Sequence, residues 1–199
     1  IRYHLEKALY MAVTGRPGPV WLDIPLDVQG AVIETENLRA YDPAENPEQK
    51  PQEISQEIIE KILDKIEESH RPVLSPGNGV RLAGAIGEFH ELVELLGVPV
   101  VTGMSSVDAL ESDHPYFAGR SGGTGTRAGN FALQNSDVLL SIGNRQGFTQ
   151  TGFQYQDWAR ESYTILNDID ENELKKPSLH VSLPVVGDCL LYTSDAADD

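Results

Sequence analysis

Short apolar runs alternate with longer, helically periodic segments between residues 53 and 188, and this alternation restricts the fold more than any other feature. Residues 137–142 (DVLLSI) form a near-continuous apolar run, which is typical of a strand covered on both faces of its sheet. Strands that alternate with helices pair in parallel, because a parallel pair needs a long connection between its members. The alternation therefore predicts an α/β fold built on an open parallel sheet.

The individual elements follow from composition and periodicity. Strands are predicted where apolar and β-branched side chains concentrate, at residues 71–74, 98–102, 137–142, 162–169 and 181–186. Helices are predicted at residues 54–66, 81–96 and 128–135. The first of these places its isoleucines and leucine on one face and Glu and Lys on the other. Gly97 follows the second helix and is expected to end it.

The first 33 residues are predicted to form a separate part of the chain. Residues 1–14 have helical spacing of apolar side chains, and Gly15 stands where such a helix would stop. Residues 20–24 (VWLDI) read as a buried strand that ends before Pro25. Segment 34–52 holds three prolines among charges and is expected to be an extended linker, so the next domain is placed at residues 53–188.

Charge and motif content exclude several classes of function. The formal charge of −16 disfavours binding of nucleic acid, which needs clustered Lys and Arg, and no apolar run of about 20 residues is present to cross a membrane. The five histidines lack metal-ligand spacing. The phosphate-loop motif, the full G-x-G-x-x-G fingerprint and the G-x-S-x-G elbow of serine hydrolases are all absent.

The last eleven residues, 189–199 (CLLYTSDAADD), differ in character from what precedes them. Their first ten positions match the translation of a common transposase sequencing adapter, so residues 189–199 are expected to be a non-native tail that packs on nothing. The single cysteine, Cys189, falls in this tail. Neither a disulfide nor a cysteine metal site is therefore expected.

Four loops are rich in glycine, at residues 77–79, 102–104, 119–125 and 143–145, and all but the third follow a predicted strand. In an open parallel sheet such loops gather at the carboxyl edge, where ligands bind. Glycine lets the backbone approach a phosphate closely, although a tight turn alone explains a Gly-x-Gly sequence equally well. The residues by themselves predict an α/β domain with a nucleotide-like pocket.

A family resemblance extends this interpretation. The strings GRPGPVWLDIPLDVQ, RPVLSPGNGV, LGVPVVTGMSSVDALESDHPYFAG, GTGTRAGNFALQNSDVLLSIGNR, NDIDENELKKP and LPVVGD occur in one order along the chain. In that order they resemble thiamine-diphosphate-dependent enzymes of the acetolactate synthase large-subunit type. The resemblance implies that residues 1–33 are the last helix and strand of the pyrimidine-binding α/β domain, and that residues 53–188 are the Rossmann-like central domain.

In flavin-carrying members of this family the central domain holds FAD, and in some relatives it holds an adenine nucleotide. Carried over to this chain, the implied cofactor-binding residues lie in the glycine-rich loops and at or after strand ends: Gly77, Gly79, Thr102, Gly103, Gly122, Gly125, Arg145, Asp168, Ile169 and Asp188. Two positions depart from the family pattern. Thr124 replaces a histidine, and Gln146-Gly147-Phe148 replace Phe-Asp-Asp after Arg145. Both departures disfavour flavin.

The resemblance also implies the reaction. The parent enzyme would use thiamine diphosphate and Mg²⁺ to decarboxylate a 2-keto acid and transfer a two-carbon unit, as a cytoplasmic homodimer or homotetramer. Its activating Glu is expected before residue 1 and its diphosphate–Mg²⁺ motif after Asp188, so no catalytic residue is assigned here. The alternatives are a 2-keto-acid or acyl-CoA decarboxylase and a non-catalytic nucleotide-binding or scaffold domain; a free-standing NAD-binding protein is disfavoured because its fingerprint is missing.

Overall fold

The computed structural model describes residues 1–47 and 53–190. These residues form two compact units that divide between Lys50 and Pro51, and each unit is described by itself.

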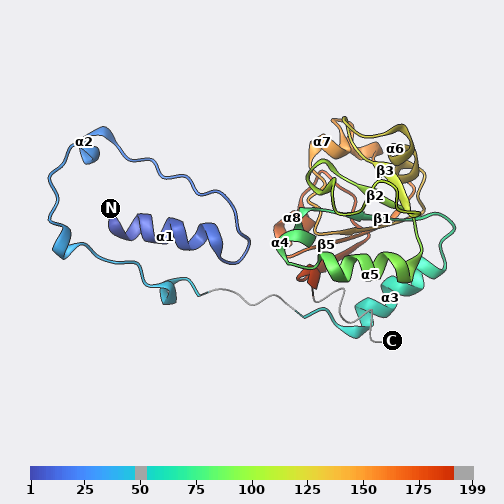
Figure 1. The fold of residues 1–199 in the computed structure, drawn as a ribbon, viewed down its shortest axis with the longest axis horizontal. Helices are drawn as coiled ribbons and strands as arrows, with labels where there is room; N and C mark the ends of the chain where they lie inside the picture. Colours follow the sequence, from blue (N-terminus) through green and yellow to red (C-terminus); the bar gives the residue numbers. More distant parts are fainter. Residues whose placement is uncertain (48–52, 191–199) are drawn as a thin grey trace. The chain divides into compact units, whose positions relative to one another are not determined.

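The second unit is built on one six-stranded, wholly parallel sheet with the order β3-β2-β1-β4-β5-β6 (Figure 1). Its strands are β1 (Pro72–Pro76), β2 (Val100–Thr102), β3 (Phe117–Arg120), β4 (Val138–Ile142), β5 (Tyr163–Asp168) and β6 (Leu183–Val186). This is the doubly wound arrangement in which the strand order reverses between β1 and β4. The predicted α/β fold with an open parallel, Rossmann-like sheet is confirmed.

Helices cover both faces of this sheet (Figure 1). They are α3 (Gln56–Glu67), α4 (Asn78–Leu82), α5 (Ile86–Leu96), α6 (Arg127–Gln134), α7 (Phe148–Thr151) and α8 (Glu171–Lys175), with 3-10 turns at Met104–Ser106 and Tyr155–Asp157. The larger core lies under α3 and α5, where Ile62 and Phe89 pack on Leu140 and its neighbours. A smaller core, which includes Leu133 of α6 and Leu139 of β4, lies on the opposite face. The alternation of side chains along each strand supplies both cores.

The structure divides one predicted helix and adds one strand that was not predicted. The segment expected to form a single helix at residues 81–96 is instead α4 and α5, because Gly84 adopts φ +74°, outside the helical region. Gly97 ends α5 in the left-handed conformation at φ +60°, as predicted. Strand β3 was missed because its sequence, FAGR, has neither β-branched residues nor apolar alternation.

The first unit contains α1 (Arg2–Val13), α2 (Leu26–Gln29) and 3-10 turns at Thr35–Asn37 and Pro43–Glu45. The helix predicted for residues 1–14 is confirmed. The strand predicted at residues 20–24 is wrong: no strand forms among residues 1–47, and the Trp21 side chain is 90% exposed. A strand needs a neighbour to satisfy its backbone groups, and residues 1–47 offer none.

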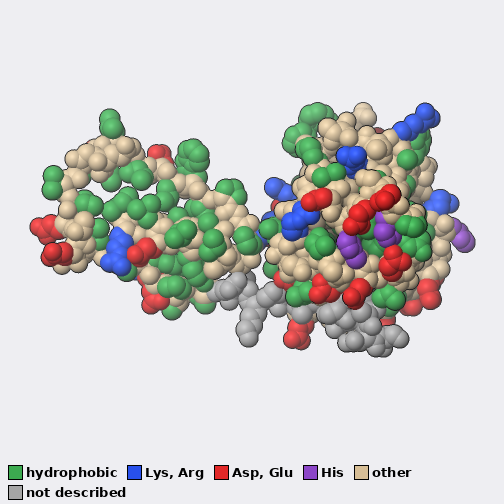
Figure 2. All heavy atoms as spheres, viewed as in Figure 1, with side chains coloured by type: hydrophobic (Ala, Val, Ile, Leu, Met, Phe, Trp, Pro, Cys, Tyr) green, Lys and Arg blue, Asp and Glu red, His purple; other side chains and the backbone are tan. Residues whose placement is uncertain are grey.

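Tyr41 ties the end of the first unit to its helix. This residue is only 8% exposed and lies between Tyr3 and Tyr10 of α1, with each ring centroid 5.5 Å away. Its backbone N–H donates to Glu6 at 2.8 Å. Part of the predicted linker therefore packs on α1, although many hydrophobic side chains of this unit remain exposed (Figure 2).

The expectation that residues 189–199 pack on nothing is wrong at its first position. Cys189 is 5% exposed and belongs to the larger core, because the chain leaving β6 turns back beside Gly143. Leu190 is 38% exposed, and residues 191–199 lie outside the described residues. The non-native origin of this tail stays a prediction.

Substitution of two helical glycines by alanine tests how closely the helices pack on the sheet. A Cβ on Gly129 of α6 would stand 2.5 Å from the backbone N and O of Arg120, so Gly129→Ala should destabilise the unit by about 2 kcal/mol despite its better helix propensity. Gly87 of α5 has nothing within 4 Å of its Cβ position. Gly87→Ala should instead stabilise by about 0.5 kcal/mol.

Urea denaturation of the full chain measures both free energies of unfolding. The same sign for the two variants would contradict the direct contact between α6 and β3.

Candidate functional site

The carboxyl ends of β1 and β4 mark the one place in this sheet where neighbouring strands connect in opposite directions. β1 leads toward β2 on one side, and β4 leads toward β5 on the other. In open α/β sheets this arrangement opens a crevice just beyond the strand ends, where ligands bind. The residues after β1 and β4 are therefore where the candidate site is centred.

Gly77 and Gly79 are in direct backbone contact with the loop that follows β4. The Gly77 N–H donates to the carbonyl of Ile142 at 2.8 Å, and the Gly79 N–H donates to the carbonyl of Gly143 at 2.9 Å. A Cβ on Gly79 would stand 2.6 Å from the Cα of Gly143, and one on Gly77 would overlap the Gly143 carbonyl. These glycines thus let two loops meet, and their N–H groups are already engaged.

Gly103 and Gly122 lie against α7. The amide nitrogen of the Gln150 side chain occupies the space where a Cβ on Gly103 would stand, and the Thr149 carbonyl does so for Gly122. The next residue, Gly123, donates its N–H to the Thr149 carbonyl at 3.1 Å. The loops after β2 and β3 therefore meet α7 at the carboxyl edge.

Gly125 serves a turn of its own loop. Its N–H donates to the Gly122 carbonyl at 2.9 Å, and a Cβ would meet the Arg120 carbonyl. Gly122 itself is held by Asn130 of α6, which accepts from its N–H at 2.9 Å. Contacts with α6 and β3 thus hold this turn in place.

A buried polar network connects β1 with the loop after β4. The Asn144 side-chain amide donates to Ser75 Oγ at 3.2 Å, while Asn144 Oδ1 accepts from the Gln146 N–H at 3.2 Å. The Gln146 amide donates in turn to Ser141 Oγ at 2.9 Å. The sequence interpretation missed this network. The sequence did offer one indication of it, namely small polar residues near the ends of apolar strands. A polar side chain buried at such a position needs a hydrogen-bond partner elsewhere in the fold.

Three polar atoms near this edge are fully buried without a hydrogen-bond partner in the described part of the chain: Thr102 Oγ1, Gln146 Oε1 and Gln150 Nε2. Gln146 also adopts φ +49°, a left-handed conformation that side-chain-bearing residues rarely adopt. Unpaired buried polar groups and strained backbone both concentrate at functional sites.

Arg145 lies at the rim of the edge. Its Nε donates to Glu173 Oε1 of α8 at 2.9 Å, and the Arg145 side chain is 73% exposed. Lys176 also contacts this pair, donating from Nζ to the Arg145 carbonyl and to Glu173 Oε2, the latter at 3.1 Å. The Glu173 side chain is only 13% exposed, so the arginine is held from one side and its solvent-facing side is where a ligand phosphate would reach the guanidinium.

The last three predicted site residues lie at the ends of β5 and β6. Asp168 is 6% exposed and accepts from the N–H of Asp170 at 2.9 Å, whereas Ile169 is 36% exposed. Asp188 accepts from the Leu190 N–H at 3.0 Å. Burial, followed by the charges of Asp188 and Asp168, raises the pKa of the Cys189 thiol to about 12.

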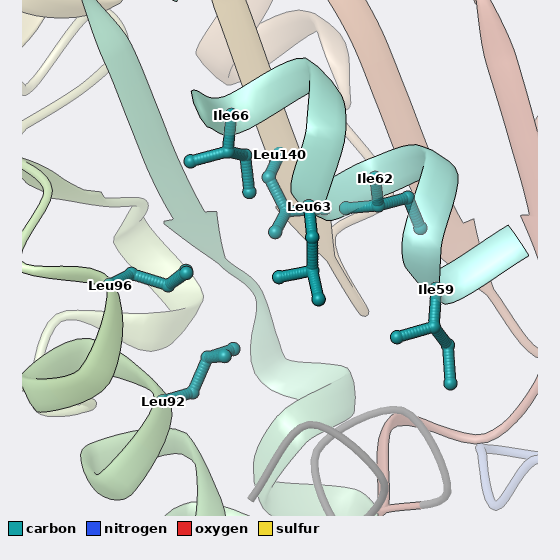
Figure 3. A pocket seen from close by; sticks show the side chains of 7 residues that line it. All are labelled: Ile59, Ile62, Leu63, Ile66, Leu92, Leu96 and Leu140. Carbon is teal, nitrogen blue, oxygen red and sulfur yellow. The ribbon is translucent and has the colours of Figure 1, made fainter. Parts of the chain in front are cut away.

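Metal sites, membrane-spanning helices and other cavities give no second candidate site among the described residues. Among residues 1–47 and 53–190, no group of three or more His, Cys, Asp or Glu side chains is arranged to hold a metal. No helix in the described ranges is long and apolar enough to cross a bilayer. An apolar hollow lies between α3 and α5 over the middle of β4, away from the strand ends (Figure 3); it is lined by Ile59, Ile62, Leu63, Ile66, Leu92, Leu96 and Leu140. These side chains offer a ligand no hydrogen bond.

Comparison with known proteins adds an independent finding. Residues 59–194 match the family described as "Thiamine pyrophosphate enzyme, central domain". The chain is 36% identical to the probable acetolactate synthase large subunit of Methanococcus aeolicus, over 96% of this chain and 32% of that protein. It is 36% identical to the acetolactate synthase large subunit of Corynebacterium glutamicum, over 92% of this chain and 29% of that protein. The corresponding values for the acetolactate synthase isozyme 2 large subunit of Escherichia coli are 32%, 90% and 32%. The chain thus spans about a third of the length of these relatives.

The environment of Cys189 makes a prediction about its reactivity. Because the raised pKa leaves almost no thiolate at pH 8, iodoacetamide should label the native chain at least about 100-fold more slowly than the chain unfolded in guanidinium. Mass spectrometry counts the label without ambiguity, since the sequence holds one cysteine.

The same shift has a defined effect on stability. The pKa of the Cys189 thiol is higher in the folded chain than in the unfolded chain. The stabilisation that the buried neutral thiol contributes is therefore fully present below about pH 8.5 and is lost as the pH rises toward 12. Equally fast labelling of the native and unfolded chains would contradict the packing of Cys189 and restore the expectation of an unpacked tail.

Proposed function

Because the chain belongs to the thiamine pyrophosphate enzymes, we propose that the whole protein is an acetolactate synthase-like enzyme that acts on a 2-keto acid. The reaction class is decarboxylation followed by transfer of a two-carbon unit to an acceptor. The observation that supports this most is the match of residues 59–194 to the central-domain family, together with identity to acetolactate synthase large subunits on both sides of residue 53. The proposed domains are 1–33, the linker 34–52, and 53–188, with 189–199 as a non-native tail.

In this proposal the residues of this chain stabilise the fold and position the neighbouring parts of the enzyme. The groups that react are supplied elsewhere in the protein. When bound, thiamine diphosphate supplies the carbanion-stabilising chemistry, and Mg²⁺ anchors its diphosphate. The second unit contributes a rigid parallel sheet, held by the pairing of β1 with β4 and by the loop contacts at its carboxyl edge. No catalytic residue is proposed within residues 1–190.

A nucleotide at the carboxyl edge is the second part of the proposal. The proposed contacts are Gly77, Gly79, Thr102, Gly103, Gly122, Gly125, Arg145, Asp168, Ile169 and Asp188. The arrangement described does not fit FAD as it stands, because Gln150 covers Gly103 and the N–H groups of Gly77 and Gly79 are engaged. With Thr124 and Gln146 in place of the family's His and Phe, we propose weak or absent flavin binding and an adenine nucleotide as the alternative ligand.

Two further candidate functions each have a specific observation in their favour. A thiamine-diphosphate-dependent 2-keto-acid or acyl-CoA decarboxylase shares the same domain, and Gln146-Gly147-Phe148 departs from the flavin-carrying pattern. A purely structural role for the domain is supported by the contacts of α7 with Gly103 and Gly122.

The proposed setting follows from charge and family. A homodimer or homotetramer in the cytoplasm is proposed for the whole enzyme. The formal charge of −16 supports the absence of nucleic-acid and membrane partners, because both surfaces are anionic and repel an acidic protein.

The full-length enzyme, obtained from its complete gene, tests the reaction. With pyruvate, thiamine diphosphate and Mg²⁺ we expect acetolactate to form, and omission of thiamine diphosphate is the matched control. Release of acetaldehyde without acetolactate would assign the decarboxylase instead. The 199-residue chain alone should show no saturable heat with thiamine diphosphate in calorimetry, and micromolar binding would contradict the domain assignment.

The absorption spectrum of the same purified enzyme tests the nucleotide. We expect a colourless protein that FAD does not saturate at micromolar concentration, and whose melting temperature rises on addition of ADP. A yellow protein with one flavin per chain would refute weak flavin binding and would show that Thr124 and Gln146 are tolerated in a flavin site.

A further inference from the structure

Residues 143–152, here called the edge cover, include α7 and lie over the loops that end β1, β2 and β3. Gly143 meets Gly79, the Gln150 side chain meets Gly103, and Thr149 meets Gly122. One segment thus occupies the approach to three of the glycines that would face a ligand. Any nucleotide that used Gly103 or Gly122 would have to displace it.

The backbone at both ends of the edge cover favours a hinge. Gly143 has φ +55°, and Gly152 has φ +76° with ψ 180°, a combination that is essentially restricted to glycine. Between them Gln146, which carries a side chain, is held at φ +49°. The two glycines rotate at little steric cost, rotation at Gln146 would relieve its strain, and together these changes would move α7 as a body.

Little apolar burial holds α7 down. None of its four residues is buried, and Phe148 is 67% exposed. Phe148 stacks on Phe153, itself 87% exposed, with the two ring centroids 5.8 Å apart. The aromatic pair therefore joins α7 to the residue that follows the edge cover and does not attach α7 to the sheet.

The polar interactions beneath the cover are incomplete. Gln146 Oε1, Gln150 Nε2 and Thr102 Oγ1 are buried with no hydrogen-bond partner among the described residues. Groups of this kind destabilise the closed arrangement, because they have lost water and gained nothing in exchange. Opening returns them to solvent or offers them to a ligand.

We propose that the edge cover is a hinged lid on the nucleotide site, closed in the arrangement described and opened by rotation at Gly143, Gln146 and Gly152. The proposal rests on the proposed nucleotide function for its ligand, but the hinge is a property of the chain itself. While the open form is a minority, apparent affinity is proportional to its population. A change that favours opening must therefore tighten binding by the same factor.

Amide hydrogen exchange of the full chain, followed by NMR, measures the opening without any ligand. The reporter is the N–H of Gly123, which donates to the Thr149 carbonyl of the closed cover. Gly152→Ala penalises the closed backbone at φ +76°, and its Cβ meets nothing within 4 Å. Exchange at Gly123 should become roughly tenfold faster.

Gly147→Ala is the matched control within the same segment. Its φ of −71° suits alanine, and its Cβ also has nothing within 4 Å, so exchange should stay at the wild-type rate. ADP, titrated by calorimetry, should bind about tenfold more tightly to the Gly152→Ala chain than to the control.

Equal exchange in the two variants would overturn the hinge. Faster exchange with unchanged ADP affinity would overturn its control of the site. If ADP binds none of the chains, the nucleotide proposal fails together with any gating of it, and the exchange ratio still decides whether the segment opens.

Discussion

The pairing of β1 with β4 is the interaction on which the rest of the second unit depends. It joins residues 72–76 to residues 138–142 in one continuous register, although the partners lie 66 positions apart in the sequence. The strands on either side extend outward from this pair, and the order of the sheet reverses there. Immediately beyond the strand ends, Gly77 and Gly79 continue the contact by bonding to the carbonyls of Ile142 and Gly143. The same central pair thus builds the core and places the loops at the carboxyl edge.

Most of this architecture could be predicted because it rests on patterns that are local in the sequence. Residues 137–142 read as a strand from their continuous apolar side chains, and α3 reads as a helix from its isoleucine stripe. The glycines after the strands were also identified, but for a different physical reason. A phosphate and a neighbouring protein group both need the space that a Cβ would fill. The structure shows that the Gly143 carbonyl fills this space at Gly77 and that the Gln150 side chain fills it at Gly103.

The elements that could not be predicted depend on partners distant in sequence. β3 forms because β2 offers it an edge, and the contact of Gly129 with Arg120 holds α6 against it. The opposite applies to residues 20–24, whose apolar side chains suit a strand but find no neighbour within residues 1–47. Cys189 was expected to be unpacked because its segment matches an adapter sequence, and that match says nothing about its surroundings in the fold. It packs because its small side chain fits beside Gly143 and Asn167. The polar network around Asn144 is indicated in the sequence only by Ser75 and Ser141 late in apolar strands, and its partners follow from the fold.

The backbone-to-backbone contact among Gly77, Gly79 and Gly143 has a consequence for how this edge diversifies. Because main-chain atoms alone make the contact, its shape is independent of which side chains surround it. Neighbouring positions such as Asn78, Thr124 and Arg145 are at least partly exposed and are bound by no such steric limit. Relatives that share the three glycines can therefore exchange the chemistry at the rim freely while inheriting an unchanged frame. Such changes would alter what the edge binds without altering the backbone that shapes it.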